Sequence, residues 1–198
     1  IAKQFDIPLV HTYHTNYEDY VHYITKGHFD TASKKIVEYL TLFLCDKTIT
    51  ELIVPTKKTY DLFKSKYKVD RDVHIIPTGI DTLVFHKDNI DQKLLEDKRK
   101  EYGIRKDDFV VLFVGRIAKE KNLGFLIDCH SDLVGKYPNL KLLIVGDGPD
   151  KEHFEQLVIK NKLENSVIFC GKVPLDSVPI YYNMASVFAT ASTTETQG

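Results

Sequence analysis

Two basic side chains follow an apolar run and stand where they could bind a phosphate group. The run is Phe109–Val114; Gly115 ends it, and Arg116 and Lys121 occupy the turn before the next helical pattern. Ligands of open α/β sheets bind at the carboxyl ends of the strands, where a helix amino terminus also favours anions. A guanidinium fork beside an ammonium group suits a diphosphate. Two solvated loop cations would give the same pattern, so both interpretations stay open.

Glycines follow the next two apolar runs. Gly146 and Gly148 come after residues 142–145, and Gly171 follows Cys170. Because glycine permits close backbone approach, these turns could cradle a phosphate or, at Gly171, let the backbone meet a flat base. Plain strand-to-helix turns would look the same. A G-x-G-x-x-G sequence is absent from the first βα turn, which argues against a dinucleotide fingerprint.

A carboxylate and a histidine complete the set of candidate residues. Glu195 follows the apolar run 187–189, and beside a phosphate site its natural role is to accept hydrogen bonds from sugar hydroxyls. Alone, it would be an ordinary surface turn residue. His11 and His14 point to opposite faces of one expected strand, so a metal pair is not expected. His14, last in the strand, is the candidate for substrate contact, and His11 is expected to pack within its domain.

Short β-type runs alternate with helix-length segments along the whole chain. Apolar strands without polar alternation, separated by helices, indicate parallel sheets that are covered on both faces. We therefore predict an α/β fold with parts of two Rossmann-like, doubly wound parallel-sheet domains. The strands are expected at residues 9–13, 51–54, 73–76, 109–114, 142–145, 167–169 and 187–189. The helices are expected at residues 33–45, 56–67, 122–137, 151–163 and 178–185, with Thr56 and Asn122 as amino-terminal caps.

Residues 82–108 are polar and lack a buried strand, which is typical of a linker that holds a short surface helix. We expect part of a first domain at 1–84, the linker at 85–108 and the first part of a second domain at 109–198. Two complete domains of this type need about 150 residues each. The chain has 198 residues and is therefore expected to be a fragment containing part of each domain.

Composition narrows the class of protein further. Apolar residues make up 43% and charged residues 28%, values that exclude collagen-like and disordered chains. A net charge of −1 disfavours a dedicated nucleic-acid binder. The longest apolar stretch is far short of the roughly 20 residues of a membrane span, and a signal-peptide pattern is absent. The three cysteines stand singly in apolar runs, a placement that predicts reduced core residues. Reduced cysteines are typical of an intracellular protein.

Residues 57–68 combine five lysines with aromatic residues at helical spacing. The simplest interpretation is an aromatic face packed on the sheet and a solvated lysine face outside. The alternative is a helix that docks on a membrane surface through its lysines and aromatic residues.

The order and placement of these motifs resemble the group 1 glycosyltransferases, the GT4-type retaining enzymes of GT-B fold. The resemblance to their C-terminal nucleotide-binding domain rests on Val114-Gly115-Arg116, Glu120-Lys121-Asn122, Val145-Gly146-Asp147-Gly148-Pro149, Phe169-Cys170-Gly171 and Ala191-Ser192-Thr193-Thr194-Glu195. Upstream, residues 8–15 look like the acceptor-domain strand that ends in the active-site histidine. Residues 75–81 look like the family's N-G-[IV]-D segment, with Thr78 where asparagine is usual.

This resemblance implies transfer of a hexose, expected to be glucose, from a UDP-sugar with retention of configuration. Arg116 and Lys121 would bind the donor diphosphate, and His14 and Glu195 would contact the donor sugar. The rest of the nucleotide site would be formed by Gly115, Gly146, Gly148, Cys170 and Gly171. The second glutamate of the family's E-x7-E pair and the N-terminal glycine loop would lie outside this chain, so the fragment alone is expected to be inactive. No metal and no cofactor besides the UDP-sugar substrate is expected.

Residues 13–20 and 193–198 most resemble the bacterial branch that glucosylates diacylglycerol to make membrane glycolipids. That branch implies a lipid acceptor and a cytoplasmic enzyme in peripheral contact with the inner face of the plasma membrane, with no nucleic-acid partner. Two other readings remain open. A UDP-sugar 2-epimerase shares the architecture but would place acid and base carboxylates in the cleft, and a non-catalytic nucleotide-binding α/β module would bind nucleotide without transferring sugar.

Overall fold

The structure of the chain is a computed structural model that describes residues 2–17 and 30–197. It divides into two compact units. The first comprises Ile1–Gly79 together with Thr194–Gly198, and the second comprises Ile80–Thr193. Within the described residues, no helix is long and apolar enough to cross a membrane.

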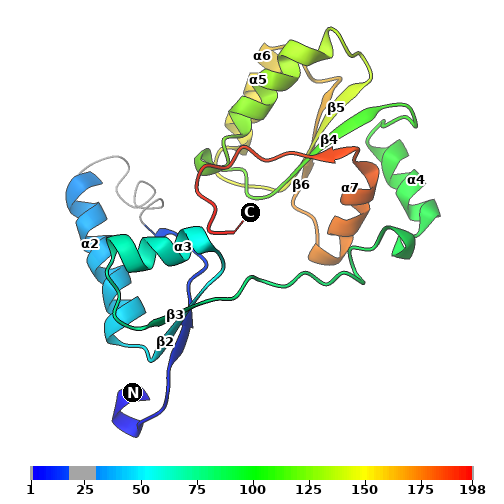
Figure 1. The fold of residues 1–198 in the computed structure, drawn as a ribbon. Helices are drawn as coiled ribbons and strands as arrows, with labels where there is room; N and C mark the ends of the chain where they lie inside the picture. Colours follow the sequence, from blue (N-terminus) through cyan, green and yellow to red (C-terminus); the bar gives the residue numbers. More distant parts are fainter. Residues whose placement is uncertain (1, 18–29, 198) are drawn as a thin grey trace. The chain divides into compact units, whose positions relative to one another are not determined.

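The first unit contains a three-stranded parallel sheet in the order β1-β2-β3 (Figure 1). Its strands are β1 (Val10–Thr12), β2 (Glu51–Val54) and β3 (Asp72–Ile75). Thr12 pairs with Ile53, which in turn pairs with His74. Among the residues that the structure describes, two helices lie between these strands, and each ends in a π-helical turn. They are α2 (Asp30–Leu42) with η3 (Phe43–Lys47), and α3 (Lys57–Asp61) with η4 (Leu62–Lys66); a short 3-10 turn, η1 (Ala2–Phe5), precedes β1.

The core of the first unit forms where β2 meets the second helix. Leu52 and Val54 of β2 are fully buried, and so is Phe63, whose ring meets the ring of Tyr13 edge-on at 4.7 Å between centroids. Pro55 ends β2, and Thr56, in an extended conformation, caps α3 by accepting a hydrogen bond from the Thr59 amide. The prediction that Thr56 caps this helix is therefore confirmed.

The second unit contains a four-stranded parallel sheet in the order β6-β5-β4-β7 (Figure 1). Its strands are β4 (Phe109–Val114), β5 (Leu140–Val145), β6 (Val167–Gly171) and β7 (Val187–Phe188). Its helices are α4 (Gln92–Glu101), α5 (Leu123–Val134), α6 (Lys151–Lys160) and α7 (Val178–Met184). Three 3-10 turns join them: η5 (Lys87–Asn89), η6 (Lys119–Lys121) and η7 (Leu175–Ser177).

Both faces of this second sheet are covered, as the strand pattern predicts. Leu142 and Ile144 of β5 pack in the core under α5 and α6, whereas Leu143 and Val145 pack in the core under α4 and α7. Because successive side chains of a strand point to opposite faces, a strand buried on both sides must be apolar at every position. The α/β prediction with parallel sheets is confirmed, and most helix and strand ends lie within a few residues of the expected ones. Cover on both faces is seen in the second sheet, whereas in the first sheet β2 alternates between buried and half-buried positions.

Two local features differ from the sequence analysis. Asn122 does not cap α5 with its side chain; it adopts a left-handed conformation (φ 50°, ψ 41°) and closes η6. Asparagine tolerates this region better than most residues, so the turn uses its backbone conformation rather than its side-chain oxygen. The second difference concerns the surface helix expected within residues 85–108. This helix is α4, which is capped by Asp91, and Leu95 of α4 joins Tyr102 and Ile104 in the core beside α7.

Candidate functional site

The carboxyl ends of three strands meet at one edge of the second sheet. The Gly115 amide donates to the Val145 carbonyl at 2.9 Å, and the Gly146 amide donates to the Gly171 carbonyl at 2.8 Å. The ends of β4, β5 and β6 are thus linked by backbone hydrogen bonds. This is the edge at which open α/β sheets bind their ligands.

Gly146 and Gly148 let the loops after β4 and β5 pack directly on each other. A Cβ atom on Gly146 would lie 1.8 Å from the Gly115 carbonyl oxygen, and one on Gly148 would lie 2.1 Å from the Ile117 carbonyl oxygen. The Ile117 amide also donates to the Asp147 carbonyl at 2.9 Å. Any side chain at either glycine would force the loops apart, so close backbone approach explains both residues.

Arg116 and Lys121 lie on the first of these loops. The Arg116 side chain is exposed, and Lys121 is half-buried at the end of η6, where its amide donates to the Ala118 carbonyl at 2.9 Å. The first turn of α5 begins at Leu123, directly after Asn122, which provides no side-chain cap. Helix amino termini carry partial positive charge, so the turn adds to the attraction that the two cations exert on an anion.

Glu120 is a structural residue that sequence reasoning missed. It is buried, and its carbonyl oxygen accepts hydrogen bonds from the Thr193 amide at 3.2 Å and the Ser192 hydroxyl at 3.3 Å. These bonds fasten the segment that leads from β7 toward Glu195 alongside η6. A glutamate between two lysines gives no sequence signal of burial, which is why the pattern could not reveal it.

Cys170 is the extra residue of an irregularity in the pairing of β5 with β6, since Ile144 pairs with Phe169 and Val145 with Gly171. Its side chain packs against the core beneath α4 and α7, and burial raises the pKa of its thiol to about 12. The thiol is therefore protonated at neutral pH and is not a nucleophile. Gly171 follows with φ +73°, a conformation that side chains rarely adopt.

Residues 194–197 lie across the strand ends of the first unit. The Thr196 hydroxyl donates to the His14 carbonyl at 2.6 Å, after β1, and the Thr196 carbonyl accepts from the Thr56 hydroxyl at 2.9 Å, after β2. After β3, the Thr78 amide donates to Oε1 of Gln197 at 2.9 Å, and Nε2 of Gln197 returns a bond to the Thr78 carbonyl at 3.3 Å.

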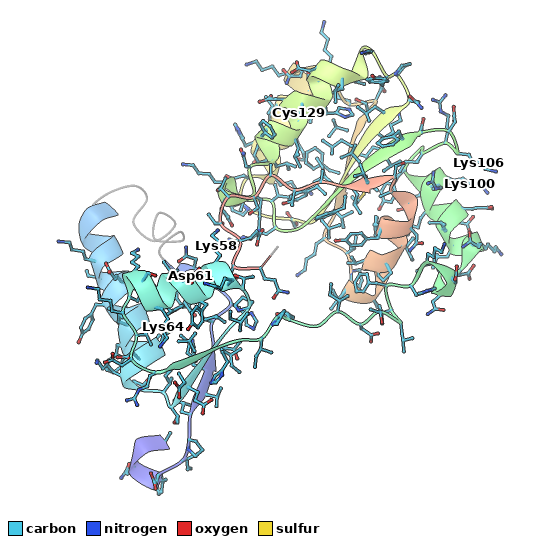
Figure 2. The ribbon with its side chains drawn as sticks, viewed as in Figure 1. Lys58, Asp61, Lys64, Lys100, Lys106 and Cys129 are labelled. Carbon is cyan, nitrogen blue, oxygen red and sulfur yellow. The ribbon has the colours of Figure 1, made fainter. Side chains whose placement is uncertain are left out.

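A cavity of about 280 Å³ opens beside this segment. Half-buried Glu195 lines it, and so does Lys58. Lys58 lies at the start of α3 (Figure 2). The remaining lining residues are Tyr13, Asn16, Thr59, Leu62, Thr194 and Thr196. The cavity therefore brings one carboxylate and one ammonium group together with hydroxyl-bearing side chains.

His11 and His14 differ in environment, as the sequence analysis expects. His14 is exposed at the end of β1. His11 is half-buried within the strand, where burial lowers the pKa of its imidazole, so that this ring is neutral at pH 7.

The lysine-rich segment 57–68 is engaged in local contacts. Lys57 pairs with Asp61, and the ammonium group of Lys64 donates to the carbonyls of Val69 at 3.1 Å and Arg71 at 2.8 Å. Figure 2 marks Lys64 beyond the end of α3. Phe63 lies on the sheet side, fully buried. The aromatic face is therefore a core face, and Lys64 stabilises the loop that leads to β3.

The predicted site residues thus fall into two groups. Arg116 and Lys121 gather at the carboxyl edge of the second sheet with the glycines and with Cys170, whereas His14 and Glu195 belong to the first unit. Within the described residues, no group of three or more histidine, cysteine, aspartate or glutamate side chains could hold a metal ion.

Parallel sheets joined by helices define the chain as an α/β protein, and its fold matches solved structures of the GT-B type. HepE from Anabaena, crystallised with UDP-glucose, superposes with a TM-score of 0.73 over 97% of this chain and 49% of its own, at 19% sequence identity. Sucrose-phosphate synthase from Thermosynechococcus elongatus gives a TM-score of 0.72 over 99% of this chain and 47% of its own, at 23% identity. At these identities the likeness shows the fold alone.

The chain belongs to the group 1 glycosyltransferases. The profile of the family described as "Glycosyl transferases group 1" matches residues 95–198, and that of "Glycosyltransferase Family 4" matches residues 1–83. Two relatives are alpha-monoglucosyldiacylglycerol synthases, 39% identical in Acholeplasma laidlawii and 38% identical in Streptococcus pneumoniae. Both alignments cover 100% of this chain but only 50% and 44% of the relatives, so the chain spans about half of their length.

Proposed function

We propose that the full-length protein transfers glucose from UDP-glucose to a diacylglycerol-type membrane lipid, with retention of configuration. The observation that carries this proposal is the 39% identity to an alpha-monoglucosyldiacylglycerol synthase along the whole chain. The geometry agrees with it, since a cationic loop stands at the ligand-binding edge of one sheet and a carboxylate-lined cavity lies in the other unit. The 198-residue chain alone is proposed to be inactive.

The second unit would hold the nucleotide diphosphate. Arg116 can form a bidentate pair with phosphate oxygens, while Lys121 and the first turn of α5 add positive charge. When the bond between sugar and phosphate breaks, negative charge grows on the leaving diphosphate. Cations that are already in position stabilise this charge without reorganisation, and this is the main electrostatic contribution to the rate. Two cations can do so without a divalent metal.

The first unit would hold the sugar. Glu195 is an acceptor of hydrogen bonds and can bind the hydroxyls of the transferred glucose. His14, whose carbonyl accepts a hydrogen bond from Thr196, would contact the same sugar. The acceptor hydroxyl then attacks the anomeric carbon from the side that the diphosphate leaves. The leaving phosphate oxygen itself takes the acceptor's proton, so no protein base is assigned.

Calorimetric titration of UDP into the full-length protein tests the diphosphate site. Arg116→Ala should weaken UDP binding and lower the rate of glucose transfer by about 100-fold, the scale of one lost electrostatic contact in a preorganised site. Lys119→Ala is the matched control, because Lys119 is an exposed cation on the same turn. Equal losses of UDP affinity and transfer rate in both variants would show that Arg116 acts only through its general charge. An unchanged transfer rate in Arg116→Ala would contradict its assignment to the diphosphate site.

An analysis of the reaction products distinguishes the other two interpretations of the site. A non-catalytic nucleotide-binding module would bind UDP but transfer no glucose to a lipid. A UDP-sugar 2-epimerase would convert the donor itself in the absence of any acceptor. Product analysis of UDP-glucose incubated with and without diacylglycerol vesicles distinguishes these outcomes.

We further propose that the full-length protein acts at the cytoplasmic face of the membrane as a peripheral protein, since diacylglycerol resides in the bilayer. Part of the lysine-rich segment 57–68 is used for local contacts, which leaves it a smaller role in docking than its composition indicates. Co-sedimentation with vesicles that contain anionic lipid should retain the protein, and high salt should release it.

A further inference from the structure

Thr56 serves two structural purposes with one hydroxyl group. As the cap of α3 it accepts a hydrogen bond from the Thr59 amide at 3.3 Å. The same oxygen donates its proton to the Thr196 carbonyl at 2.9 Å. A cap alone needs only an acceptor, which aspartate, asparagine or serine also supplies. The bond to the Thr196 carbonyl also needs a donor, which an aspartate carboxylate cannot supply.

Thr59 completes the arrangement. Its side chain is 3% exposed, and its hydroxyl oxygen lies 3.0 Å from that of Thr56 and 3.3 Å from the Thr196 carbonyl oxygen. A hydroxyl group has one proton and two acceptor positions. If Thr59 donates to Thr56 and Thr56 donates to Thr196, both hydroxyl protons are used and the bonds polarise each other in one direction.

The Thr56 bond is the middle one of three attachments. On either side of it, Thr196 binds the His14 carbonyl and Gln197 forms two bonds with the backbone of Thr78. Each attachment follows a different strand of the first sheet. The backbone on the carboxyl side of Glu195 is therefore fixed at three points, and Glu195 is the charged residue among those of this segment that line the cavity.

We propose that Thr56 is a positioning residue for Glu195: its hydroxyl holds the Thr196 carbonyl so that the neighbouring carboxylate faces the sugar. This inference rests on the proposed function. A carboxylate improves transfer only if it meets the sugar hydroxyls at hydrogen-bonding distance, and an error of about 1 Å in its placement is costly. Thr56 itself does not touch the reacting atoms.

The test uses three substitutions in the full-length protein. Thr56→Ala removes the hydroxyl without adding charge, Thr56→Asp keeps the helix cap but cannot donate, and Thr56→Ser keeps both functions. We expect kcat/KM with UDP-glucose to fall about tenfold for alanine and aspartate, the scale of one lost hydrogen bond, and serine to restore most of it. The affinity for UDP alone should stay within about twofold, because UDP lacks the sugar that Glu195 contacts.

Two further measurements separate positioning from mere folding. The melting temperature of Thr56→Ser should match that of the wild type, because its hydroxyl keeps both the α3 cap and the bond to Thr196. In a Glu195→Gln background, Thr56→Ala should cost less than about twofold, since both substitutions act through one contact. Full activity in both Thr56→Ala and Thr56→Asp, or equal additive losses in the Glu195→Gln background, would overturn the inference. A wild-type protein that neither binds UDP-glucose nor transfers glucose would instead refute the proposed function on which it rests.

Discussion

At the scale of single residues, the two glycines after β5 make the most direct prediction. A Cβ on Gly146 would meet the Gly115 carbonyl oxygen at 1.8 Å, and that contact is backbone on backbone, so no side chain can rotate away. Gly146→Ala should lower the free energy of unfolding by about 1–3 kcal/mol, the usual cost of overpacking, and weaken UDP binding with it. Gly135→Ala is the control, because a Cβ there meets nothing within 4 Å. Urea unfolding of both variants gives the comparison, and equal stability would contradict the close approach.

A second residue-scale prediction concerns His130. It is buried on α5, its Nε2 lies 2.9 Å from the Ser166 hydroxyl, and burial lowers the pKa of its imidazole from 6.5 to about 4. Between these values the unfolded chain binds a proton that the folded chain does not, so stability should rise as the pH increases from about 4 to 6.5. His130→Gln should make the unfolding midpoint less dependent on pH across this range. An unchanged slope would show that other groups, such as His11, cause the dependence.

At the scale of elements, the turn between β4 and α5 shows how a sequence signal can name the right residue for the wrong reason. Asn122 stands at the expected start of α5, but it contributes a left-handed backbone conformation rather than a side-chain cap. Both roles favour asparagine, and only the dihedral angles distinguish them.

Substitution at Asn122 separates the two roles. Serine is an excellent cap but a poor left-handed residue, whereas glycine adopts the left-handed region freely. Asn122→Ser should therefore cost about 1 kcal/mol, and Asn122→Gly should be neutral or stabilising. Thermal unfolding of the two variants measures the difference. If Asn122→Ser were as stable as the wild type, a side-chain cap would be the better explanation of Asn122.

The strands and helices themselves were largely predictable, and the contacts among loops were not. The continuous apolar run of β4 predicts a strand buried on both faces because no other placement hides every side chain. By contrast, the bonds that join Thr56 to Thr196 link residues 140 positions apart and leave no periodic trace in the sequence. The burial of Glu120 between two lysines is likewise a result of tertiary packing.

At the scale of the whole molecule, residue order predicts the class of protein better than any single motif does. Arg116, Gly146 and Gly171 are each ambiguous alone, yet they end three adjacent strands of one sheet. The parallel topology brings these strand ends to one edge, and it was inferred from the alternation of strands and helices. The spacing between the loops and the three attachments that hold residues 194–197 required coordinates.

A prediction at this scale concerns the chain of 198 residues itself. It spans about half the length of its relatives, so the isolated chain should show no measurable glucose transfer under conditions in which the full-length protein is active. Radiolabelled UDP-glucose with diacylglycerol vesicles provides the assay, and the full-length Arg116→Ala variant provides a background rate. Transfer by the isolated chain above that background would show that the half-length part is sufficient.

The first unit is discontinuous in sequence, since residues 194–198 complete it after more than a hundred residues of the second unit. Consider a hybrid that joins the N-terminal part of one enzyme to the C-terminal part of another at a single junction. Here such a junction near residue 80 would give Thr56 and Thr78 one parent and Thr196 and Gln197 another. A hybrid that preserves these hydrogen bonds therefore needs matched sequences on both sides of the junction.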